Sequence, residues 1–393
     1  MSSAATTRAD GPVVEVQGTW LANRGAELML RTVVEQLRGR LPQAILAVDP
    51  HWGSFEVRAQ LGLRQVFPRE MPGARYVERI GATGRWLGGR RAHEYLEGYG
   101  IVLRRDVDVL LDASGFALSD QWGEAKARQR ADRIVACVRN GGAAVVLPQA
   151  MGPFRDHGVR REAERVLRAA SLVYVRDEES LSHVRSIAGG EAARLAPDLT
   201  VLSPPVSEVD RVADVLVVPN GRMLDPGTGW SADAYETALV AAVEAAQDAG
   251  RSVAVLVHAG DEEDRWLAEA VARRADVSVI AEMDAMGVKA LVGSAEVVVG
   301  SRFHALLGAL LQGVPTVMIG WSHKYRALAE EFGIGGLVVG PGEVTEARRM
   351  LADLLREGGA RERHASRDNA RRQAAASAAM WDEVVSTIRQ QAG

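Results

Sequence analysis

The stretch "VVVGSRFHALLGALLQGVPTVMIG", residues 297–320, decides the fold. Its opening valines predict a short buried strand, and the apolar residues that follow Ser301 predict a helix. Gly313 and Pro315 then turn the chain into a second β-branched run at residues 316–319. Strand, helix and strand in this order are typical of a parallel sheet, so the stretch predicts an α/β fold.

The same alternation continues on both sides of this stretch. Prolines and polar residues in "LSPPVSEVDRVAD", residues 202–214, predict a linker between two halves of the chain. Each half therefore predicts one Rossmann-like, doubly wound domain. The predicted parts are a disordered tail (1–12), an N-terminal domain (13–203), a linker (204–214), a C-terminal domain (215–355) and a C-terminal helical segment (356–393). The predicted strands lie at residues 13–17, 44–49, 107–112, 143–147, 172–175, 193–195, 215–218, 253–257, 277–280, 297–299, 316–319 and 337–339.

Composition excludes several classes of function. The 47 Lys and Arg against 51 Asp and Glu leave a net charge of −4, which argues against a nucleic-acid partner and a polybasic membrane patch. A single cysteine, Cys137, forms neither an intramolecular disulfide nor a thiolate metal cluster, and no His, Cys or carboxylate cluster has metal-ligand spacing. Neither a signal peptide nor a membrane span is evident. We therefore expect a cytoplasmic protein without a metal.

The first candidate site residues are charged and lie beyond the carboxyl ends of the predicted strands of the second domain. Ligands of doubly wound sheets bind beyond the carboxyl ends of the strands. There we expect Ser301 to cap a helix whose first turn carries Arg302 and His304. Both cations oppose the helix dipole, while arginine matches phosphate or carboxylate and histidine exchanges protons near neutral pH. The alternative is a solvated arginine beside a hydrogen-bonded, half-buried histidine. Lys324, after the next strand, would add positive charge, or be simply solvated.

Polar residues also follow the strands of the first domain. Asn23 and Gly25 open a helix whose N–H groups would face an anion, or serve as a helix cap and turn. Ser114 and Gly115 let the backbone approach a ligand, and Asp120 follows them as a potential base.

Two further segments of this domain have the same character. Gln149 lies in a loop stiffened by two prolines, which would bind a ligand or only connect two elements. Arg176 precedes a helix start at Asp177, where a cation is favourable only near an anion.

At these residues the sequence resembles the polysaccharide pyruvyl transferases, over about residues 18–335. That resemblance implies two Rossmann-like domains similar to GT-B glycosyltransferases, with the active site in the interdomain cleft. Many members carry Gly-Asp where this chain has Gly25-Ala26-Glu27, which displaces the acidic group by one position. The resemblance rests on an ordered set of motifs: "NRGAELML", "SGFALSDQWG", "PQAMGPF", "VRDEESL", "APDLTVL", "VPNGRML" and "SRFHALLGALLQGVPTVMIGWSHKY".

The resemblance implies a donor, phosphoenolpyruvate, whose pyruvyl group forms a ketal with two hydroxyls of a sugar while phosphate leaves. No cofactor is required. His304 would be the general acid, and Asp120 or Glu27 would deprotonate an acceptor hydroxyl. Asp198 would orient one of these groups or serve as a cap or turn residue. The predicted catalytic set is His304, Arg302, Asp120 and Glu27; the predicted substrate-binding set is Arg176, Asn23, Gly25, Ser114, Gly115, Gln149, Lys324 and Asp198.

The acceptor is expected to be a glycan or glycan precursor of the cell envelope, and a lipid-linked acceptor would bring the protein into peripheral contact with a membrane. The N-terminal domain is the expected acceptor side and the C-terminal domain the expected donor side. Residues 50–65 and 85–100, which are rich in Trp, Tyr and Arg, are the expected acceptor-side segments, unless their aromatic residues pack in the core. Two alternatives stay open from the sequence. One is a GT-B-type nucleotide-sugar glycosyltransferase, and the other is a non-catalytic subunit that kept the fold.

Overall fold

The computed structural model describes residues 11–67, 95–189, 191–260, 262–281 and 283–393. They form two compact units. Unit 1 holds the segment that ends at Leu21, Met29–Ser203 and Ala376–Gly393, and unit 2 holds Ala22–Leu28 and Pro204–Ala375. Residues 1–10 of the predicted tail and residues 85–94 of one predicted acceptor segment lie outside the described residues.

Unit 1 is built on an eight-stranded parallel sheet with the order β4-β3-β2-β1-β5-β6-β7-β8. The chain order reverses between β1 and β5, which makes their carboxyl ends the expected ligand-binding position. The strands are β1 (Val13–Gln17), β2 (Ile45–Val48), β3 (Arg64–Val66), β4 (Ile101–Val102), β5 (Val109–Asp112), β6 (Ala143–Gln149), β7 (Leu172–Val175) and β8 (Arg194–Leu195).

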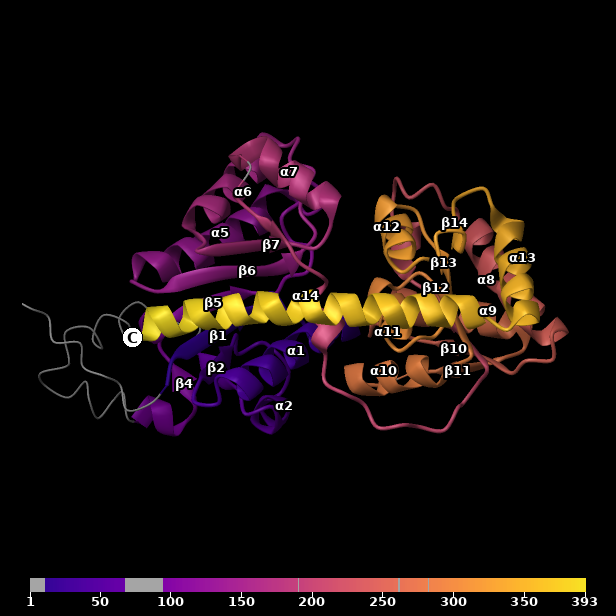
Figure 1. Ribbon diagram of the computed structural model, residues 1–393, viewed down its shortest axis with the longest axis horizontal. Helices are drawn as coiled ribbons and strands as arrows, with labels where there is room; N and C mark the ends of the chain where they lie inside the picture. Colours follow the sequence, from indigo (N-terminus) through magenta and orange to yellow (C-terminus); the bar gives the residue numbers. More distant parts are fainter. Residues whose placement is uncertain (1–10, 68–94, 190, 261, 282) are drawn as a thin grey trace, which may run out of the picture. The chain divides into compact units, whose positions relative to one another are not determined.

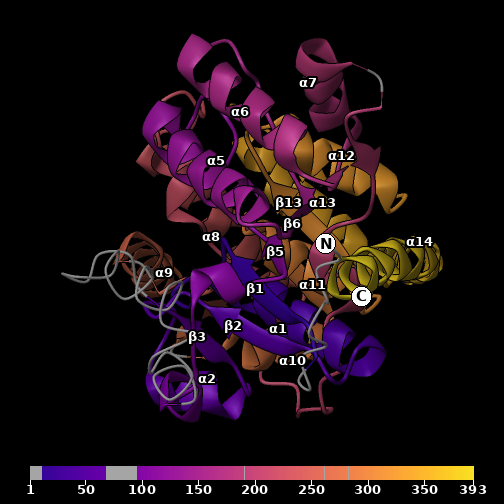
Figure 2. The same cartoon turned by 90° about the vertical axis from the view of Figure 1, so that its left-hand side faces the viewer.

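Amphipathic helices cover this sheet. Ile134 and Val166 pack with strand residues such as Leu110 and Val146 in one buried core. Figure 2 shows α5 and α6 side by side above the strands. The elements outside the sheet are α1 (Arg24–Arg40), α2 (Phe55–Gln60), α5 (Gly123–Arg139), α6 (His157–Ala169), α7 (Glu178–Ala188) and the short 3₁₀ turns η1 (Arg104–Asp106) and η2 (Leu199–Leu202).

Unit 2 has a six-stranded parallel sheet with the order β11-β10-β9-β12-β13-β14. Here the order reverses between β9 and β12. The strands are β9 (Val215–Val218), β10 (Val253–Leu256), β11 (Ser278–Ile280), β12 (Val297–Gly300), β13 (Thr316–Ile319) and β14 (Val338–Val339). The other elements are η3 (Gly221–Leu224), α8 (Ala232–Asp248), α9 (Glu262–Ala275), α10 (Ala285–Ser294), α11 (Phe303–Leu311), α12 (His323–Glu331) and α13 (Val344–Glu357).

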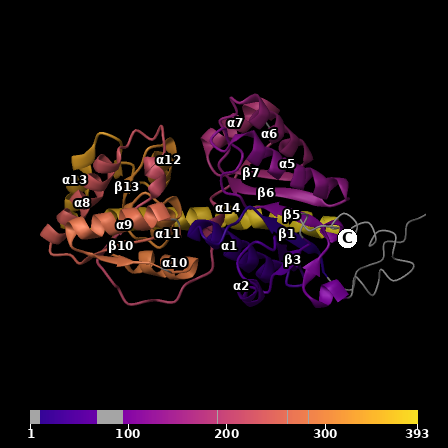
Figure 3. The same ribbon diagram turned by 180° about the vertical axis from the view of Figure 1, so that it is seen from behind.

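The valine run that predicted the fold explains the layers of unit 2. Val297 and Val299 belong to the core with α8, α9 and α13, whereas Val298 belongs to the core with α10, α11 and α12. Successive strand residues point to opposite faces, so a continuous apolar run fits a sheet buried on both sides. Figure 3 shows α8 and α13 across β10 from α10. The predicted fold class, two doubly wound α/β sheets, is confirmed.

The last helix, α14 (Ala360–Ala392), is one continuous helix, drawn in yellow in Figure 1. Its residues up to Ala375 belong to unit 2 and those from Ala376 belong to unit 1. In unit 1, Glu383 accepts hydrogen bonds from the hydroxyl of Tyr174 and from Arg194, the latter over 2.6 Å. The predicted helical segment started at residue 356, where the structure still has the end of α13.

Two strands of unit 1 were not predicted. β3 and β4 have three and two residues and lie at one edge of the sheet. Such short elements carry too little hydrophobic pattern to be recognised. No helix among the described residues is long and apolar enough to cross a membrane.

Candidate functional site

Three loops of unit 2 meet at the carboxylate of Asp264, beside the point where the strand order reverses. Asp264 is fully buried in the first turn of α9. One oxygen accepts the backbone N–H of Gly221, after β9, over 2.7 Å, and the other accepts the N–H of Ala259, after β10, over 3.4 Å. Arg302, after β12, donates from Nε over 2.7 Å and from Nη2. A single carboxylate thus ties the loops that follow β9, β10 and β12.

Arg302 therefore has a carboxylate partner in the structure, and its side chain is only 11% exposed. Bidentate pairing of this kind fixes the plane of the guanidinium group. Residue 302 is also the N-cap position of α11 and makes no side-chain cap hydrogen bond. The predicted cap at Ser301 is wrong: Ser301 is buried, its hydroxyl accepts a hydrogen bond from Tyr235 over 2.8 Å, and its carbonyl accepts one from Tyr325. The strand continues through residue 300 and leaves Ser301 inside the loop.

His304 lies in the first turn of α11, against the first turn of α1. A Cβ atom added to Gly25 would lie 2.1 Å from Nδ1 of His304, so the imidazole ring occupies the space that a side chain at residue 25 would need. The ring of Phe303 packs edge-on at 5.5 Å. Glycine at position 25 thus serves the close approach of a histidine, a role that its sequence context did not reveal.

The start of α1 belongs to unit 2 through several contacts. Asn23 Oδ1 accepts the N–H groups of Gly25 and Ala26, so Asn23 is the helix cap, one of its two predicted roles. Its backbone also forms an antiparallel bridge with Ala259. Glu27 is fully buried and accepts the N–H of Ala285 over 3.2 Å.

Arg24 donates a second hydrogen bond to Glu27, also over 3.2 Å. Glu27 therefore anchors the start of α1 on α10. Its role as a base stays a prediction.

A second histidine, His258, was missed in the sequence. It follows β10 and is 4% exposed, and its Nδ1 has no hydrogen-bond partner among the described residues. Burial lowers its pKa well below the usual value, and the positive charges of Arg302, His304 and Arg24 lower it further. The sequence signal for His258 was its position directly after the strand predicted at residues 253–257. His258 is therefore neutral at physiological pH.

Lys324 lies in the first turn of α12, after β13. Its ammonium group is 4.5 Å from the ring centre of Trp321 and 5.1 Å from that of Tyr325. Such cation–π contacts hold a lysine ammonium group in place.

The remaining predicted residues lie in unit 1. Arg176, 9% exposed, pairs with Asp198 over 3.4 Å and lies 3.8 Å from Asp177. Asp198 also accepts hydrogen bonds from the N–H and hydroxyl of Thr200 over 2.9 and 2.7 Å. Asp198 therefore caps the turn η2, and it also holds Arg176, a contact that was not predicted.

Asp120 has a structural role that was not predicted. Its two oxygens accept the backbone N–H groups of Arg155 and Asp156 over 2.9 and 3.2 Å. This pairing closes the loop after β6 onto the loop after β5. The role of Asp120 as a base stays a prediction.

Ser114 and Gln149 meet at Asp112, the last residue of β5. Asp112 is fully buried and accepts hydrogen bonds from the hydroxyl of Ser114 and, over 3.4 Å, from Nε2 of Gln149. Gly115 has φ +69° and packs against Met29, so this turn demands glycine. Gln149, predicted in a loop, is the last residue of β6 because the strand continues through Pro148, and it meets Ser114 of the loop after β5 at this carboxylate.

Unit 2 thus places the imidazole of His304 in the first turn of α11, beside the guanidinium group of Arg302, which Asp264 holds in place. The family model for polysaccharide pyruvyl transferases matches residues 23–323, which contain all of these groups except Lys324. The chain belongs to the polysaccharide pyruvyl transferase family. This is a family of transferase enzymes, and the resemblance seen in the sequence is confirmed.

Solved structures with the same fold are GT-B glycosyltransferases and related proteins. Anabaena HepE in complex with UDP and glucose aligns with a TM-score of 0.57 at 12% identity, over 97% of this pyruvyl transferase family member and 100% of that chain. Staphylococcus aureus MnaA with UDP aligns with 0.54 at 11%, over 91% of both chains. The spinosyn rhamnosyltransferase SpnG aligns with 0.51 at 14%, over 96% and 100%. These TM-scores show a shared GT-B-like fold. No curated protein matches the sequence.

Proposed function

We propose that this family member transfers the pyruvyl group of phosphoenolpyruvate to two hydroxyls of a sugar, with release of phosphate. The observation that carries the proposal is the position of Arg302 and His304 at the start of α11, beside the strand-order reversal of unit 2. Asp264 holds Arg302 there, and both residues lie within the span matched by the family model.

The charged side chains near Arg302 and His304 indicate how an anionic donor is held. The carboxylates of Asp264 and Glu27 offset the guanidinium charges of Arg302 and Arg24. We expect phosphoenolpyruvate to be held by the N–H groups at the start of α11 together with Arg302, Lys324 and a protonated His304. Arg302 acts from a fixed position because Asp264 holds its guanidinium group.

The chemistry needs one proton donor. His304 gives a proton to C3 of the enol, which makes C2 electrophilic, and a sugar hydroxyl attacks C2 and loses its proton. The C2–O bond to phosphate then breaks, phosphate leaves with the bonding electrons, and a neighbouring hydroxyl attacks C2 and loses its proton. The product is a cyclic ketal in which C2 carries a methyl and a carboxylate group. A histidine suits the first step because its pKa range lies near neutral pH.

Phosphate release from phosphoenolpyruvate tests this proposal, measured with a panel of lipid-linked and nucleotide-linked sugars. Mass spectrometry of the acceptor should show the added pyruvyl group. Release of UDP from a UDP-sugar, with no phosphate from phosphoenolpyruvate, would instead identify a glycosyltransferase.

His304→Gln tests the proton donor. Turnover should fall roughly 10²- to 10⁴-fold, the usual contribution of a general acid, while affinity for phosphoenolpyruvate changes much less. The control is His364→Gln, since the His364 side chain on α14 is 81% exposed. Turnover near the parental rate in folded His304→Gln would show that the proton comes from another group.

A further inference from the structure

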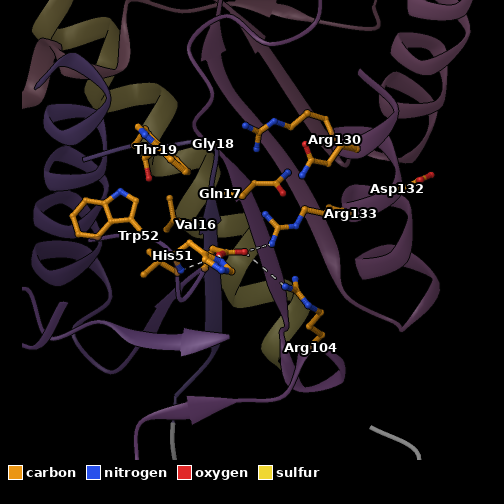
Figure 4. A pocket seen from close by; sticks show the side chains of 14 residues that line it. Val16, Gln17, Gly18, Thr19, His51, Trp52, Arg104, Arg130, Asp132 and Arg133 are labelled. Atoms are coloured by element: carbon orange, nitrogen blue, oxygen red, sulfur yellow. Dashed lines mark hydrogen bonds and ion pairs between the residues drawn. The ribbon is translucent and has the colours of Figure 1, made fainter. Parts of the chain in front are cut away.

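Unit 1 contains a cavity that the proposed chemistry has not used. Its volume is about 500 Å³, within the range of roughly 300–1,000 Å³ typical of small-molecule sites. The wall is formed by residues at and after the ends of β1 and β2, by Arg104, and by one face of α5 (Figure 4). The residues at the ends of β1 and β2 are Val16, Gln17, Gly18, Thr19, Trp20, Val48, Asp49, His51 and Trp52. These are the carboxyl ends of the strands beside the reversal between β1 and β5, where doubly wound sheets bind ligands.

The charged residues on one side of the cavity are paired with one another. Asp49 lies 2.5 Å from Arg133 and 4.0 Å from Arg104, and His51 Nδ1 is 2.8 Å from the same carboxylate (Figure 4). Arg104 also lies 3.3 Å from the buried Glu15. Burial would raise the pKa of Asp49, yet the hydrogen bonds from His51 and Arg133 outweigh it and lower the pKa to about 2.

The charged residues on the other side of the cavity are also paired with opposite charges. Arg130 lies 3.9 Å from the buried Asp112, and Asp132 lies 2.8 Å from Arg165. Each of the three lining arginines thus faces a carboxylate. An anion entering this cavity would compete with carboxylates already in place, whereas an uncharged ligand could hydrogen-bond to both members of each pair.

Gln17 lines this cavity with a buried side-chain amide. Its side chain is 2% exposed, and neither the oxygen nor the nitrogen of its amide has a hydrogen-bond partner among the described residues. Figure 4 shows the amide between Arg130 and Arg133. A buried amide without hydrogen-bond partners destabilises the folded protein. A ligand that both donates and accepts hydrogen bonds, as a pair of hydroxyl groups does, would satisfy it.

Two tryptophans complete the wall. Trp52 is 3% exposed and its indole N–H also has no partner among the described residues, while Trp20 is 61% exposed. Indole rings offer an apolar face together with one polar donor. That combination matches a ring that has hydroxyl groups at its edge and C–H groups on its faces.

We propose that this cavity binds an uncharged, hydroxyl-rich ring, namely a sugar, and that Gln17 determines its recognition. In the setting of the proposed pyruvyl transfer, on which this last step rests, the ring is the acceptor sugar or the neighbouring sugar of its glycan. Asp49 stays ionised and accepts hydrogen bonds from sugar hydroxyls, and the indoles of Trp20 and Trp52 contact the ring.

Binding is tested without turnover, on the full chain with ¹⁵N-labelled tryptophan. The probes are the methyl glycosides of glucose, galactose, mannose and N-acetylglucosamine, and the readout is the indole N–H signal of Trp52, assigned with Trp52→Phe. At least one glycoside should shift this signal at millimolar concentration. Absence of a shift with all four would overturn the proposal, and so would a shift with inorganic phosphate at equal or higher affinity.

Gln17→Leu separates recognition from folding. Leucine fills similar space and removes the unsatisfied amide, so thermal stability should be maintained or increased, while glycoside affinity falls at least about tenfold. Unchanged affinity would contradict the proposal. Trp20→Ala is the second variant, because an exposed side chain is dispensable for folding; it should also weaken binding. Trp266→Ala is its control, since Trp266 is 50% exposed on α9 and does not line the cavity.

The same variants distinguish this inference from the proposed function. Glycoside binding that Gln17→Leu abolishes, in a protein that releases no phosphate from phosphoenolpyruvate, would support the cavity and refute the transferase reaction. Pyruvyl transfer with an acceptor KM that is unchanged in Gln17→Leu and Trp20→Ala would do the opposite. In a protein that fulfils both, Gln17→Leu should raise the acceptor KM and leave the KM for phosphoenolpyruvate unchanged.

Discussion

At the scale of single residues, the clearest requirement is the absence of a side chain at Gly25. The ring of His304 fills the position of the missing Cβ. Gly25→Ala should displace the imidazole and reduce pyruvyl transfer roughly 10²-fold, the usual effect of a 1 Å misplacement of a reacting group. Turnover and melting temperature would be measured on one preparation.

Gly39→Ala is the matched control in the same helix. A Cβ atom at Gly39 meets nothing within 4 Å, so alanine should leave turnover unchanged and add about 0.5–1 kcal/mol of stability through helix propensity. Equal turnover in both variants would show that the position of His304 against α1 is irrelevant to the reaction.

His258 gives unit 2 a pH-dependent stability. Because burial first, and nearby positive charge second, keep its pKa well below the usual 6.5, the folded state binds no proton where the unfolded state does. Stability is therefore complete above about pH 6.5 and declines below it, by up to about 1.4 kcal/mol per pH unit. Urea unfolding of the wild type and His258→Gln, at about pH 5 and about pH 7, measures this slope. A slope of the same size in His258→Gln would assign it to other groups.

At the scale of elements, the loops after β9, β10 and β12 depend on one another through Asp264. Asp264→Asn removes the charge that compensates the largely buried guanidinium group of Arg302, and breaking such a pair costs about 3–5 kcal/mol. We expect a lower melting temperature and weaker binding of phosphoenolpyruvate. Glu262→Gln, at an exposed position in the same helical turn, is the control and should resemble the wild type. A wild-type melting temperature in Asp264→Asn would show that the three loops hold their positions independently.

At the scale of the whole molecule, α14 belongs to both units, and its last half is part of the core of unit 1. Trp381 is fully buried there. Trp381→Ala should destabilise unit 1 by about 3–5 kcal/mol. Hydrogen exchange should then accelerate in β6 and β7 but not in β12 and β13. Trp266→Ala, at an exposed site of unit 2, should change neither pair. Equal acceleration in both pairs would mean that the two units unfold together.

Much of the fold was predictable because local hydrophobic patterns in the sequence indicate the strands and helices. Strand β9 was predicted with its observed bounds, since a continuous apolar run such as VLVV is typical of a sheet buried on both faces. The edge strands β3 and β4 were missed because two or three residues have no periodicity to detect.

The candidate site was predictable as a set of residues and not as an arrangement. Position after a strand marked Arg302 and His304, because parallel strands direct all their carboxyl ends to one edge. Nothing in the sequence assigned Asp264 as the partner of Arg302, or Glu27 and Asp120 to backbone N–H groups, since those contacts join residues 35 to 258 positions apart. Local sequence determines which side chains reach the ends of the strands, while only tertiary packing decides which of their charges are already neutralised by a partner.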